Sequence, residues 1–285
     1  MKHPFISISI EEIQNKIDEL DALDTQKTSN EDLRQRCNAL MKGYTHITRL
    51  ITSPYAWRAR KNTGSSFFNN ISELWYPPKD VVGTFGRLNK PNQSIMYIAA
   101  SQDSAIHEMR PKIGEKITIL RLKLKDKRKY PRVSELGVVD RSKHFNCDTK
   151  IRLAEDTVTG KALLSKDSSI HKNRLIRGYL AREFTKIVER GYEHQFKVSA
   201  TIADILFNMP NMDGIEYPCL AGAVSSYNGA ASLGLLPNSA DKLYIPDSCW
   251  VGEVIDLPTH PDNPFGLLCI GRAESFFSDG TIEWS

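Results

Sequence analysis

The chain has 285 residues, of which 40% are hydrophobic and 25% are charged. Both proportions are close to the globular average, so they predict a buried core and exclude wholesale disorder. No apolar run approaches the roughly 20 residues needed to cross a bilayer. The N-terminus lacks the apolar segment and cleavage site of a signal peptide. We therefore expect a soluble cytoplasmic protein with no membrane partner.

The net charge and the cysteines argue against two further classes. The formal net charge of +4 is too small to indicate a nucleic-acid-binding protein. The five cysteines are odd in number, form no C-x-x-C pair and have no histidine at zinc-finger spacing. We expect reduced, mostly buried thiols and no metal site.

Residues 1–50 are predicted to form an N-terminal helical hairpin. Ser9, followed three residues later by Glu12, has the pattern of a helix capping box. The apolar residues of the first helix fall on one stripe, namely Ile10, Ile13, Ile17 and Leu20. A polar break at 25–30 leads to a second helix, which we expect to end at Gly43. Because such a hairpin cannot bury both of its faces alone, it must pack on the rest of the chain or on a partner.

Residues 51–285 mix strand and helix signals and are predicted to form one α+β domain. Strands are expected at 95–100, 117–125 and 215–217, and near 250–256 and 266–273. Helices are expected at 102–110, at 173–190 and through Ile202, Ile205 and Leu206. Ser101 has the features of an N-cap for the first of these helices, and Pro111 ends it. The polar segment 126–170 gives no clear signal.

Positive charge is concentrated between Arg121 and Lys129. Here leucines alternate with basic residues, as Leu120, Leu122 and Leu124 against Arg121, Lys123 and Lys125. This period of two is typical of a half-buried strand with a solvated cationic face. Contact with phosphate or nucleic acid is the weaker alternative.

One arginine, one tyrosine and one glutamate form a spaced set. Arg87 lies in Gly86-Arg-Leu-Asn89, Tyr97 follows ten residues later in a predicted strand, and Glu108 follows eleven residues after that in a helix. In the last turn of a helix, the dipole disfavours a negative charge by up to about 1 kcal/mol. Each residue alone has an ordinary structural interpretation, such as a surface glutamate paired with Arg110. Their joint spacing favours a functional site.

Four stretches of the chain resemble one known family. They are Gly86-Arg-Leu-Asn89, Ile95-Met-Tyr-Ile-Ala99, Ala105-Ile-His-Glu108 and, about 100 residues later, Asp213-Gly-Ile-Glu-Tyr-Pro218. The family is the RES domain, named for its Arg, Glu and Ser signature, and the resemblance covers roughly 55–247. Its members are toxins of bacterial toxin–antitoxin pairs that deplete NAD by hydrolysis or phosphorolysis, and some have been proposed to transfer ADP-ribose. The resemblance implies an ADP-ribosyltransferase-like mixed β-sheet core with flanking helices, NAD as a substrate rather than a cofactor, and an antitoxin partner.

The resemblance also implies which residues form the site. Arg87, Tyr97 and Glu108 match the arginine, tyrosine and glutamate of the family. Arg60 resembles a further arginine near the start of the domain, with Arg58 as the competing choice.

The serine of the signature is where this chain departs from the family. In the family, the serine directly follows the proline of the Asp-Gly-Ile-x-Tyr-Pro stretch, and this chain has Cys219 there. Either the thiol, which is a weak donor, replaces the hydroxyl, or Ser225 or Ser226 supplies it. Asn228 resembles the asparagine that opens the next strand and is expected to help bind NAD.

The chemistry of NAD accounts for these residue types. Arginine donates paired, charge-assisted hydrogen bonds to a pyrophosphate. When neutral nicotinamide departs, an oxocarbenium-like ribose remains, and a fixed carboxylate such as Glu108 stabilises it. Tyr97 offers an apolar face for stacking and a hydroxyl for a hydrogen bond. The chain lacks the G-x-G-x-x-G pattern of hydride-carrying NAD enzymes, which fits an NAD that is consumed.

Three functions stay open from the sequence. The first is an NAD glycohydrolase or phosphorylase that acts as a toxin or defence effector, and the second is an ADP-ribosyltransferase that modifies a protein or a small molecule. The third is a non-catalytic protein whose hairpin and basic strand bind a partner or nucleic acid. Cys219 favours the third function, whereas the intact Arg87, Tyr97 and Glu108 set favours the first two. His107 is expected to be structural, and the oligomeric state, including a homodimer, is not fixed.

Overall fold

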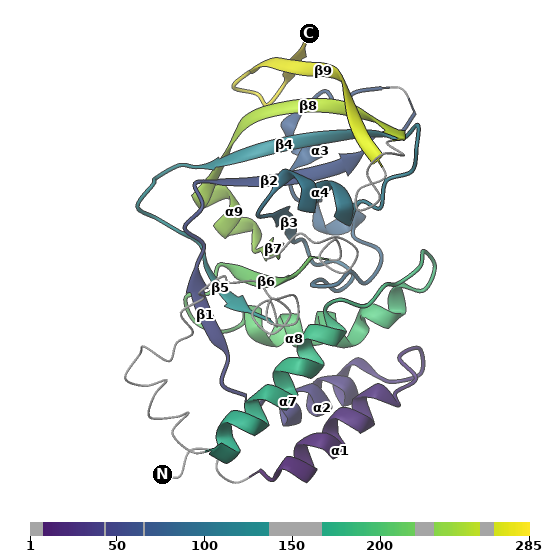
Figure 1. Cartoon of the computed structure of the whole chain (residues 1–285), viewed down its shortest axis with the longest axis vertical. Coiled ribbons are helices and arrows are strands. Elements are labelled where there is room, and N and C mark those ends of the chain that lie inside the picture. The colour runs from purple at the N-terminus through teal and green to yellow at the C-terminus, as the bar shows by residue number, and fades with distance from the viewer. Residues whose placement is uncertain (1–7, 43, 65, 137–166, 220–230, 257–264) are drawn as a thin grey trace.

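The structure is a computed structural model that describes residues 8–42, 44–64, 66–136, 167–219, 231–256 and 265–285. Within these residues, ten strands form one sheet in the order β1-β5-β6-β7-β3-β2-β4-β8-β9-β10 (Figure 1). The strands are β1 (Ile47–Leu50), β2 (Tyr55–Lys61), β3 (Met96–Ala99), β4 (Lys116–Leu124), β5 (Arg132–Glu135), β6 (Gly214–Pro218), β7 (Ala231–Leu235), β8 (Tyr244–Asp256), β9 (Phe265–Phe276) and β10 (Ile282–Trp284). β5 and β6 run parallel and the other neighbouring pairs run antiparallel, so the sheet is mixed. The predicted α+β class is confirmed.

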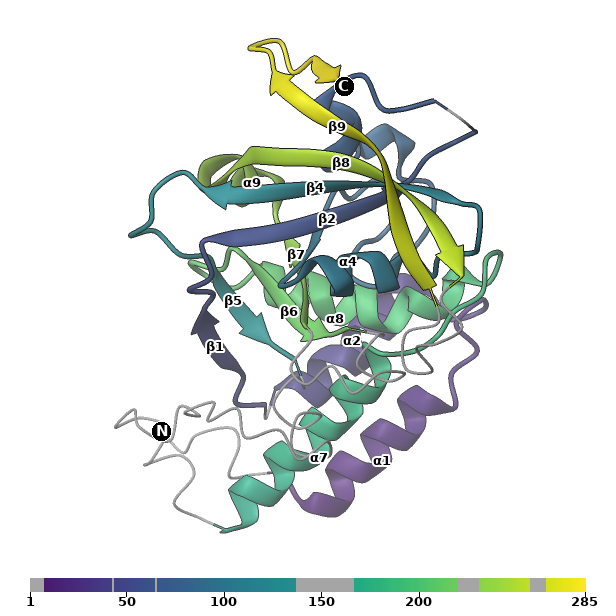
Figure 2. The same cartoon turned by 45° about the horizontal axis from the view of Figure 1, so that its top comes forward.

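Seven α-helices accompany the sheet in the described part of the chain. They are α1 (Ile10–Asp21), α2 (Asn30–Met41), α3 (Ile71–Leu74), α4 (Gln102–Glu108), α7 (Asp167–Glu183), α8 (Lys197–Phe207) and α9 (Pro237–Leu243), with short 3-10 helices η2 (Lys79–Val81) and η4 (Glu193–Phe196). Figures 1 and 2 show α1, α2, α7 and α8 gathered at one end of the molecule, with β8 and β9 at the other. No helix among the described residues is both long enough and apolar enough to cross a membrane.

The core has three parts. The first joins the buried sides of α1, α2, α7 and α8 to Leu88, Ile95 and Tyr217. The second lies where α3 and α9 cover the sheet, and the third lies under α4. The predicted alternation is confirmed in the second half of β4, where Leu120, Leu122 and Leu124 are buried and Lys123 is exposed. In the first half it fails, because residues 117–119 are all buried.

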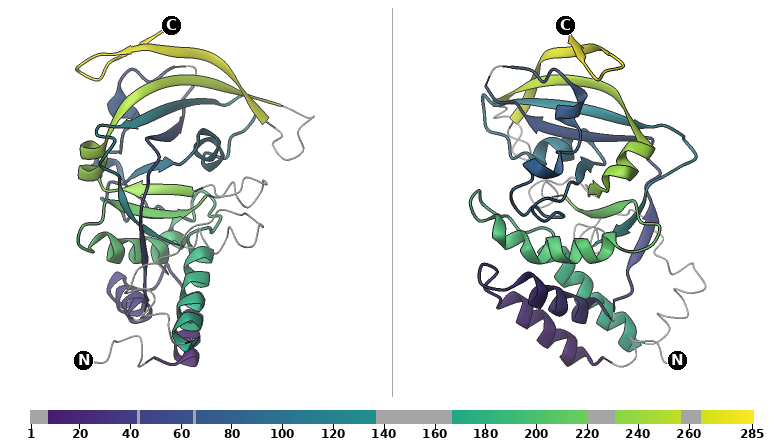
Figure 3. Two further views of the ribbon diagram at one scale, coloured as in Figure 1. Left: turned by 60° about the vertical axis from the view of Figure 1, so that its left-hand side comes forward. Right: turned by 180° about the vertical axis from the view of Figure 1, so that it is seen from behind.

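The two N-terminal helices lie against α7 and α8 (Figure 3). The predicted capping box is present, because Ser9 Oγ accepts a hydrogen bond from the Glu12 amide at 3.0 Å and the Glu12 carboxylate accepts one from the Ser9 amide at 3.2 Å. Ile10, which the sequence placed on the apolar stripe, is exposed. Gly43, the expected end of the second helix, lies outside the described residues.

The predicted helix at 173–190 differs from α7, which begins at Asp167 and ends at Glu183. The hydroxyl of Thr185 donates to the Ala181 carbonyl at 2.7 Å, which competes with continuation of the helix. Arg87 donates to the carbonyls of Phe184 and Lys186, so these groups are satisfied without a further helical turn. Ile187, which was expected on the buried face, is exposed as a result.

The described cysteines are free thiols. Cys37, Cys219 and Cys249 are buried, as predicted, whereas Cys269 on β9 is exposed. Burial raises the pKa of the Cys37 and Cys249 thiols to about 12, so both are neutral at physiological pH.

Candidate active site

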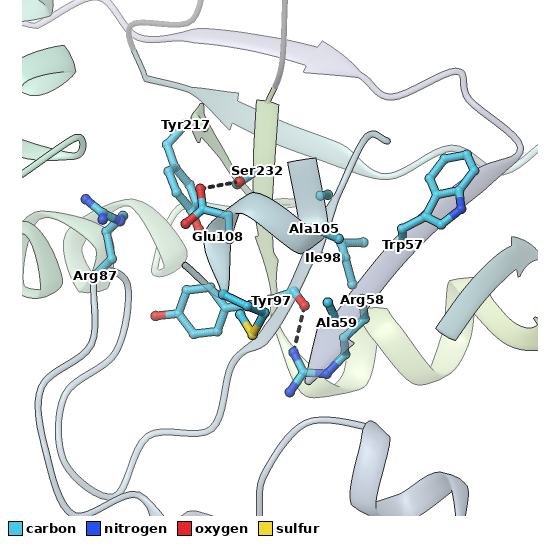
Figure 4. A pocket seen from close by; sticks show the side chains of 12 residues that line it. Trp57, Arg58, Ala59, Arg87, Tyr97, Ile98, Ala105, Glu108, Tyr217 and Ser232 are labelled. Atoms are coloured by element: carbon cyan, nitrogen blue, oxygen red, sulfur yellow. Dashed lines mark hydrogen bonds between the residues drawn. The ribbon is translucent and has the colours of Figure 1, made fainter. Parts of the chain in front are cut away.

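A pocket of about 140 Å³ opens between α4, strands β2 and β3, the ends of β6 and β7, and the loop that carries Arg87. It is lined by Trp57, Arg58, Ala59, Arg87, Tyr97, Ile98, Ala99, Ala105, Glu108, Met109, Tyr217 and Ser232 (Figure 4). The three residues that the sequence set apart by their spacing, Arg87, Tyr97 and Glu108, therefore line the same pocket. In Figure 4, Arg87 and Arg58 lie on opposite sides of Tyr97, and the Glu108 carboxylate lies next to Tyr217 and Ser232.

Glu108 is the last residue of α4. The helix begins where predicted, with Ser101 Oγ accepting a hydrogen bond from the Ser104 amide at 3.1 Å. Its buried residues Ala105 and Ile106 fix it on the sheet, which turns Glu108 toward the pocket. The buried hydroxyl of Ser232, on β7, donates to Glu108 Oε1 at 2.9 Å. The carboxylate is thus held in one orientation.

Arg87 is buried with only 7% of its surface exposed. Its Nη1 donates to the Phe184 carbonyl at 2.5 Å and its Nη2 to the Lys186 carbonyl at 3.1 Å. The guanidinium carbon lies 5.1 Å from the ring centre of Phe196 and 5.7 Å from that of Tyr217. Carbonyls just beyond a helix C-terminus and aromatic faces both attract a cation, so these contacts offset the cost of burying Arg87.

Tyr97 shapes the loop that carries Arg87. Its hydroxyl accepts a hydrogen bond from the Leu88 amide at 2.9 Å and donates one to Asn89 Oδ1 at 2.8 Å. Burial raises the pKa of this hydroxyl well above its usual value, so it stays neutral. A side chain at Gly86 would overlap Asn89 Oδ1 and come within 3.1 Å of the Tyr97 hydroxyl, so it would displace the Asn89 side chain from its hydrogen bond to Tyr97. The ring lines the pocket, while the hydroxyl is used by the loop.

Tyr217 completes the wall opposite Tyr97. It lies on β6 directly opposite Ser232 in the strand register and is only 3% exposed. Burial raises the pKa of its hydroxyl well above the usual value, and the nearby charge of Glu108 acts in the same direction. The Tyr217 hydroxyl is therefore neutral. Its ring contacts the Arg87 guanidinium, and its hydroxyl is close enough to Glu108 for the carboxylate charge to act on it.

Of the two arginines that compete near the start of the domain, Arg58 lines the pocket and Arg60 does not. Arg58 Nη1 donates to the Tyr97 carbonyl at 2.6 Å, and its Nε is buried without a hydrogen-bond partner among the described residues. Burial lowers the pKa of Arg58 to about 10, helped by the charge of Arg60, and leaves it protonated at neutral pH. Arg60 instead donates to the Glu73 carbonyl and lies over the Phe68 ring at 5.3 Å.

The cysteine at the position of the expected serine does not reach the pocket. Cys219 is fully buried, and its Sγ lies 3.6 Å from the Ser104 carbonyl in α4. Ser225, Ser226 and Asn228 lie outside the described residues, so their expected roles stay predictions. Among the described residues, the hydroxyl of Ser232 donates a hydrogen bond to Glu108.

Among the pocket residues that carry a hydroxyl, sequence reasoning did not name Ser232 or Tyr217 as site residues. Tyr217 lies inside the Asp213–Pro218 stretch, so that motif already pointed to it. For Ser232 the signal is the alternation of small and large residues in β7, where Leu233 and Leu235 are buried in the core shared with α3 and α9. The smaller residues on the other face, Ser232 and Gly234, are approached by Glu108 and Leu88.

The basic residues of β4 form ion pairs with an aspartate on the neighbouring strand β8. Arg121 and Lys123 of β4 both pair with Asp247, at 2.6 and 3.2 Å, and Arg121 also lies 5.0 Å from the ring centre of Tyr55. These contacts agree with the interpretation of Arg121 and Lys123 as the solvated cationic face of a half-buried strand.

Comparison with known proteins adds no further information about the site. The sequence matches no protein-family model, and neither curated proteins nor solved structures give a match.

Proposed function

We propose that this protein binds NAD in the pocket and breaks the bond between nicotinamide and ribose. The observation that carries the proposal is the convergence of Arg87, Tyr97 and Glu108 on one pocket, with Glu108 held by a buried serine. The resemblance to the RES family supports the same activity. The proposal includes that family's ADP-ribosyltransferase-like fold, with the N-terminal helices as an added hairpin.

Glu108 has the position and surroundings of a group that stabilises positive charge. As the glycosidic bond breaks, its electron pair leaves with neutral nicotinamide, and the ribose becomes oxocarbenium-like. A carboxylate held by Ser232 needs no reorganisation at that moment, which is the condition for large electrostatic stabilisation. Water or phosphate then adds to the ribose carbon, and its proton passes to a base or to solvent.

The arginines account for recognition of the anionic part of NAD. Each terminal nitrogen of Arg87 uses one N–H in its carbonyl bonds, which leaves a second N–H for a ligand. Arg58 brings a second guanidinium whose Nε has no partner in the described residues. Unpaired buried donors are costly, so a pocket that contains them gains from an anionic ligand.

The size of the pocket fits one end of a dinucleotide. About 140 Å³ is below the 300–1,000 Å³ typical of sites that enclose a drug-sized ligand. We therefore assign the nicotinamide and its ribose to the space between Tyr97, Tyr217 and Glu108. The remainder of NAD then extends out past the arginines.

The biological role proposed here is that of a cytoplasmic toxin or defence effector that depletes NAD and is restrained by an antitoxin. This part rests on the family resemblance. Transfer of ADP-ribose to a protein or small molecule uses the same bond cleavage and differs only in the acceptor.

The test is to incubate the purified protein with NAD, with and without phosphate, and to identify the products by mass spectrometry. Free nicotinamide with ADP-ribose indicates hydrolysis, and nicotinamide with a phosphorylated ADP-ribose indicates phosphorolysis. ADP-ribose attached to the protein or to an added extract indicates transfer. Absence of nicotinamide with phosphate, without phosphate and with an added extract would overturn the proposal.

A further inference from the structure

The N-terminal helices α1 and α2 lie far from the pocket in sequence but pack in the same core as residues next to Arg87. Leu33 and Leu40 of α2 are fully buried in the core that contains Leu88, the residue after Arg87. We infer that α2 positions Arg87 for substrate binding through an ion-pair bridge of Arg34, Asp204 and Lys90. What Arg87 does for the substrate rests on the proposed function.

The bridge joins three elements at one carboxylate. Asp204 lies on α8, and its Oδ2 accepts from Arg34 Nη1 of α2 at 2.5 Å and from Lys90 Nζ at 2.8 Å. The Asp204 and Lys90 side chains are only 20% and 28% exposed. Burial opposes ionisation of Asp204, yet the hydrogen bonds from Lys90 and Arg34 lower its pKa. Such partly buried, shared pairs are less screened than isolated surface pairs.

Lys90 is tied firmly to the turn that presents Arg87. Asn89 Nδ2 donates to the carbonyls of Thr84 and Lys90, and the Lys90 amide donates to Gln93 Oε1 at 3.0 Å. The hydroxyl of Tyr97 holds the other side of the same turn, at Leu88 and Asn89. Anchoring the ammonium of Lys90 therefore restrains the turn as a unit.

The same helix shares its core with Phe184, the residue that follows the end of α7 and supports Arg87. Cys37 of α2 is fully buried, and the charges that act on its thiol are those of Glu183 and Lys90. Glu183, which pairs with Lys186 Nζ at 2.5 Å, directly precedes Phe184, whose carbonyl binds Arg87. Residues of α2 thus pack in the same core as Leu88, which follows Arg87, and Phe184, whose carbonyl binds its guanidinium.

The chain offers a matched control on the same helix. Arg36 of α2 pairs with Asp32 at 3.0 Å and with Glu19 of α1 at 3.4 Å, so its ion pairs with described residues all lie within the two N-terminal helices. Arg36→Met removes one cation from α2, as Arg34→Met does, but leaves the Asp204 bridge intact. Lys90→Met removes the other half of the bridge, and Lys90→Arg retains a cation there.

The first readout is hydrogen exchange at the amides of 86–90, measured without NAD. We expect exchange to become several-fold faster in Lys90→Met and in Arg34→Met, and to stay at the wild-type rate in Arg36→Met and Lys90→Arg. Thermal unfolding shows that each variant is folded. The inference would be overturned if the amides of 86–90 exchanged at the wild-type rate in Lys90→Met. It would also be overturned if their exchange rate rose as much in Arg36→Met as in Lys90→Met.

The second readout is the kinetics of nicotinamide release. If the turn holds Arg87 in the binding position in only a fraction of the molecules, the apparent affinity for NAD is reduced by that fraction. The complex that does form still reacts at the normal rate. Lys90→Met is therefore expected to raise KM about fivefold with kcat nearly unchanged. A fall in kcat with unchanged KM would contradict a positioning role. If the wild type releases no nicotinamide, the proposed function fails, and the exchange measurement still decides this inference.

Discussion

Ser232 and Glu108 are 124 residues apart in the chain and are joined by a hydrogen bond of 2.9 Å from Ser232 Oγ to Glu108 Oε1. If this bond orients the carboxylate for catalysis, Ser232→Ala should lower kcat for nicotinamide release by about tenfold or more. The loss of one hydrogen bond to a carboxylate should cost about 1.5–3 kcal/mol of stability. Steady-state kinetics and urea unfolding of the variant measure both effects.

A matched control exists on α9. Ser239 Oγ donates to Asp213 Oδ1 at 2.8 Å, so Ser239→Ala removes a similar hydroxyl–carboxylate bond away from the pocket. It should leave kcat unchanged. An equal loss of activity in both serine variants would show that Ser232 acts only through the stability of the fold.

Arg58 and Arg60 provide a second comparison within a single strand. Arg58 lines the pocket and has an unpaired buried Nε, whereas Arg60 binds the Glu73 carbonyl outside it. Arg58→Met should raise KM for NAD by roughly tenfold or more, since a charged hydrogen bond contributes about 1.5–3 kcal/mol. Arg60→Met should leave KM within about twofold of the wild type. The opposite ranking in a titration of initial rates would mean that Arg60 recognises the substrate.

The hydroxyl of Tyr97 has a structural effect that can be measured without substrate. Tyr97→Phe leaves the Leu88 amide and Asn89 Oδ1 without their shared partner, which should lower the free energy of unfolding by about 1–3 kcal/mol. Because that bond restrains the turn next to Arg87, KM for NAD should rise as well. Unchanged stability, measured by urea unfolding, would show that the hydroxyl does not hold the turn.

A buried glutamate on the far side of β6 predicts a pH dependence of stability. Glu216 is 1% exposed, and burial raises its pKa to about 7, although Arg49 at 2.7 Å partly opposes this and Glu135 adds to it. The folded state therefore binds a proton between about pH 4.5 and pH 7 that the unfolded state has released. Stability is highest below this window and falls as the pH rises through it.

The size of this effect is on the order of 3 kcal/mol at most, from the shift between the ordinary pKa and about 7. Urea unfolding of the wild type from pH 5 to pH 8 should show the decline. Glu216→Gln, which does not titrate, should lose that part of the pH dependence. Parallel curves for the two proteins would rule out Glu216 as the source.

Local signals in the sequence predicted the elements that local interactions stabilise. α4 begins at its N-cap serine, Ser101, and α1 at its capping box. β4 follows its alternation of leucines and basic residues. Where long-range contacts set the end of an element, the sequence did not predict that end. α7 ends early because Arg87, 97 residues away from Phe184, takes the carbonyl at its end.

The short strands and part of the site were not predictable for similar reasons. β1 and β5 have four residues each, too few for a period to appear, and the two arginines of β2 obscure its alternation. Arg87, Tyr97 and Glu108 were predicted from their spacing and from the resemblance of their motifs to the RES family. Arg58 rather than Arg60 lines the pocket because of the way β2 pairs with β3. Ser232 rather than Cys219 lines it because of the pairing between β6 and β7.

The most direct measurement is the initial rate of nicotinamide release from NAD by the wild type and by Glu108→Gln, prepared and assayed in parallel. Glutamine keeps an acceptor for the Ser232 hydroxyl but removes the negative charge that stabilises the ribose cation. The account predicts release by the wild type and a rate at least about 100-fold lower in Glu108→Gln, with both proteins unfolding at similar temperatures. Equal rates in the two proteins, or no release by the wild type, would contradict it.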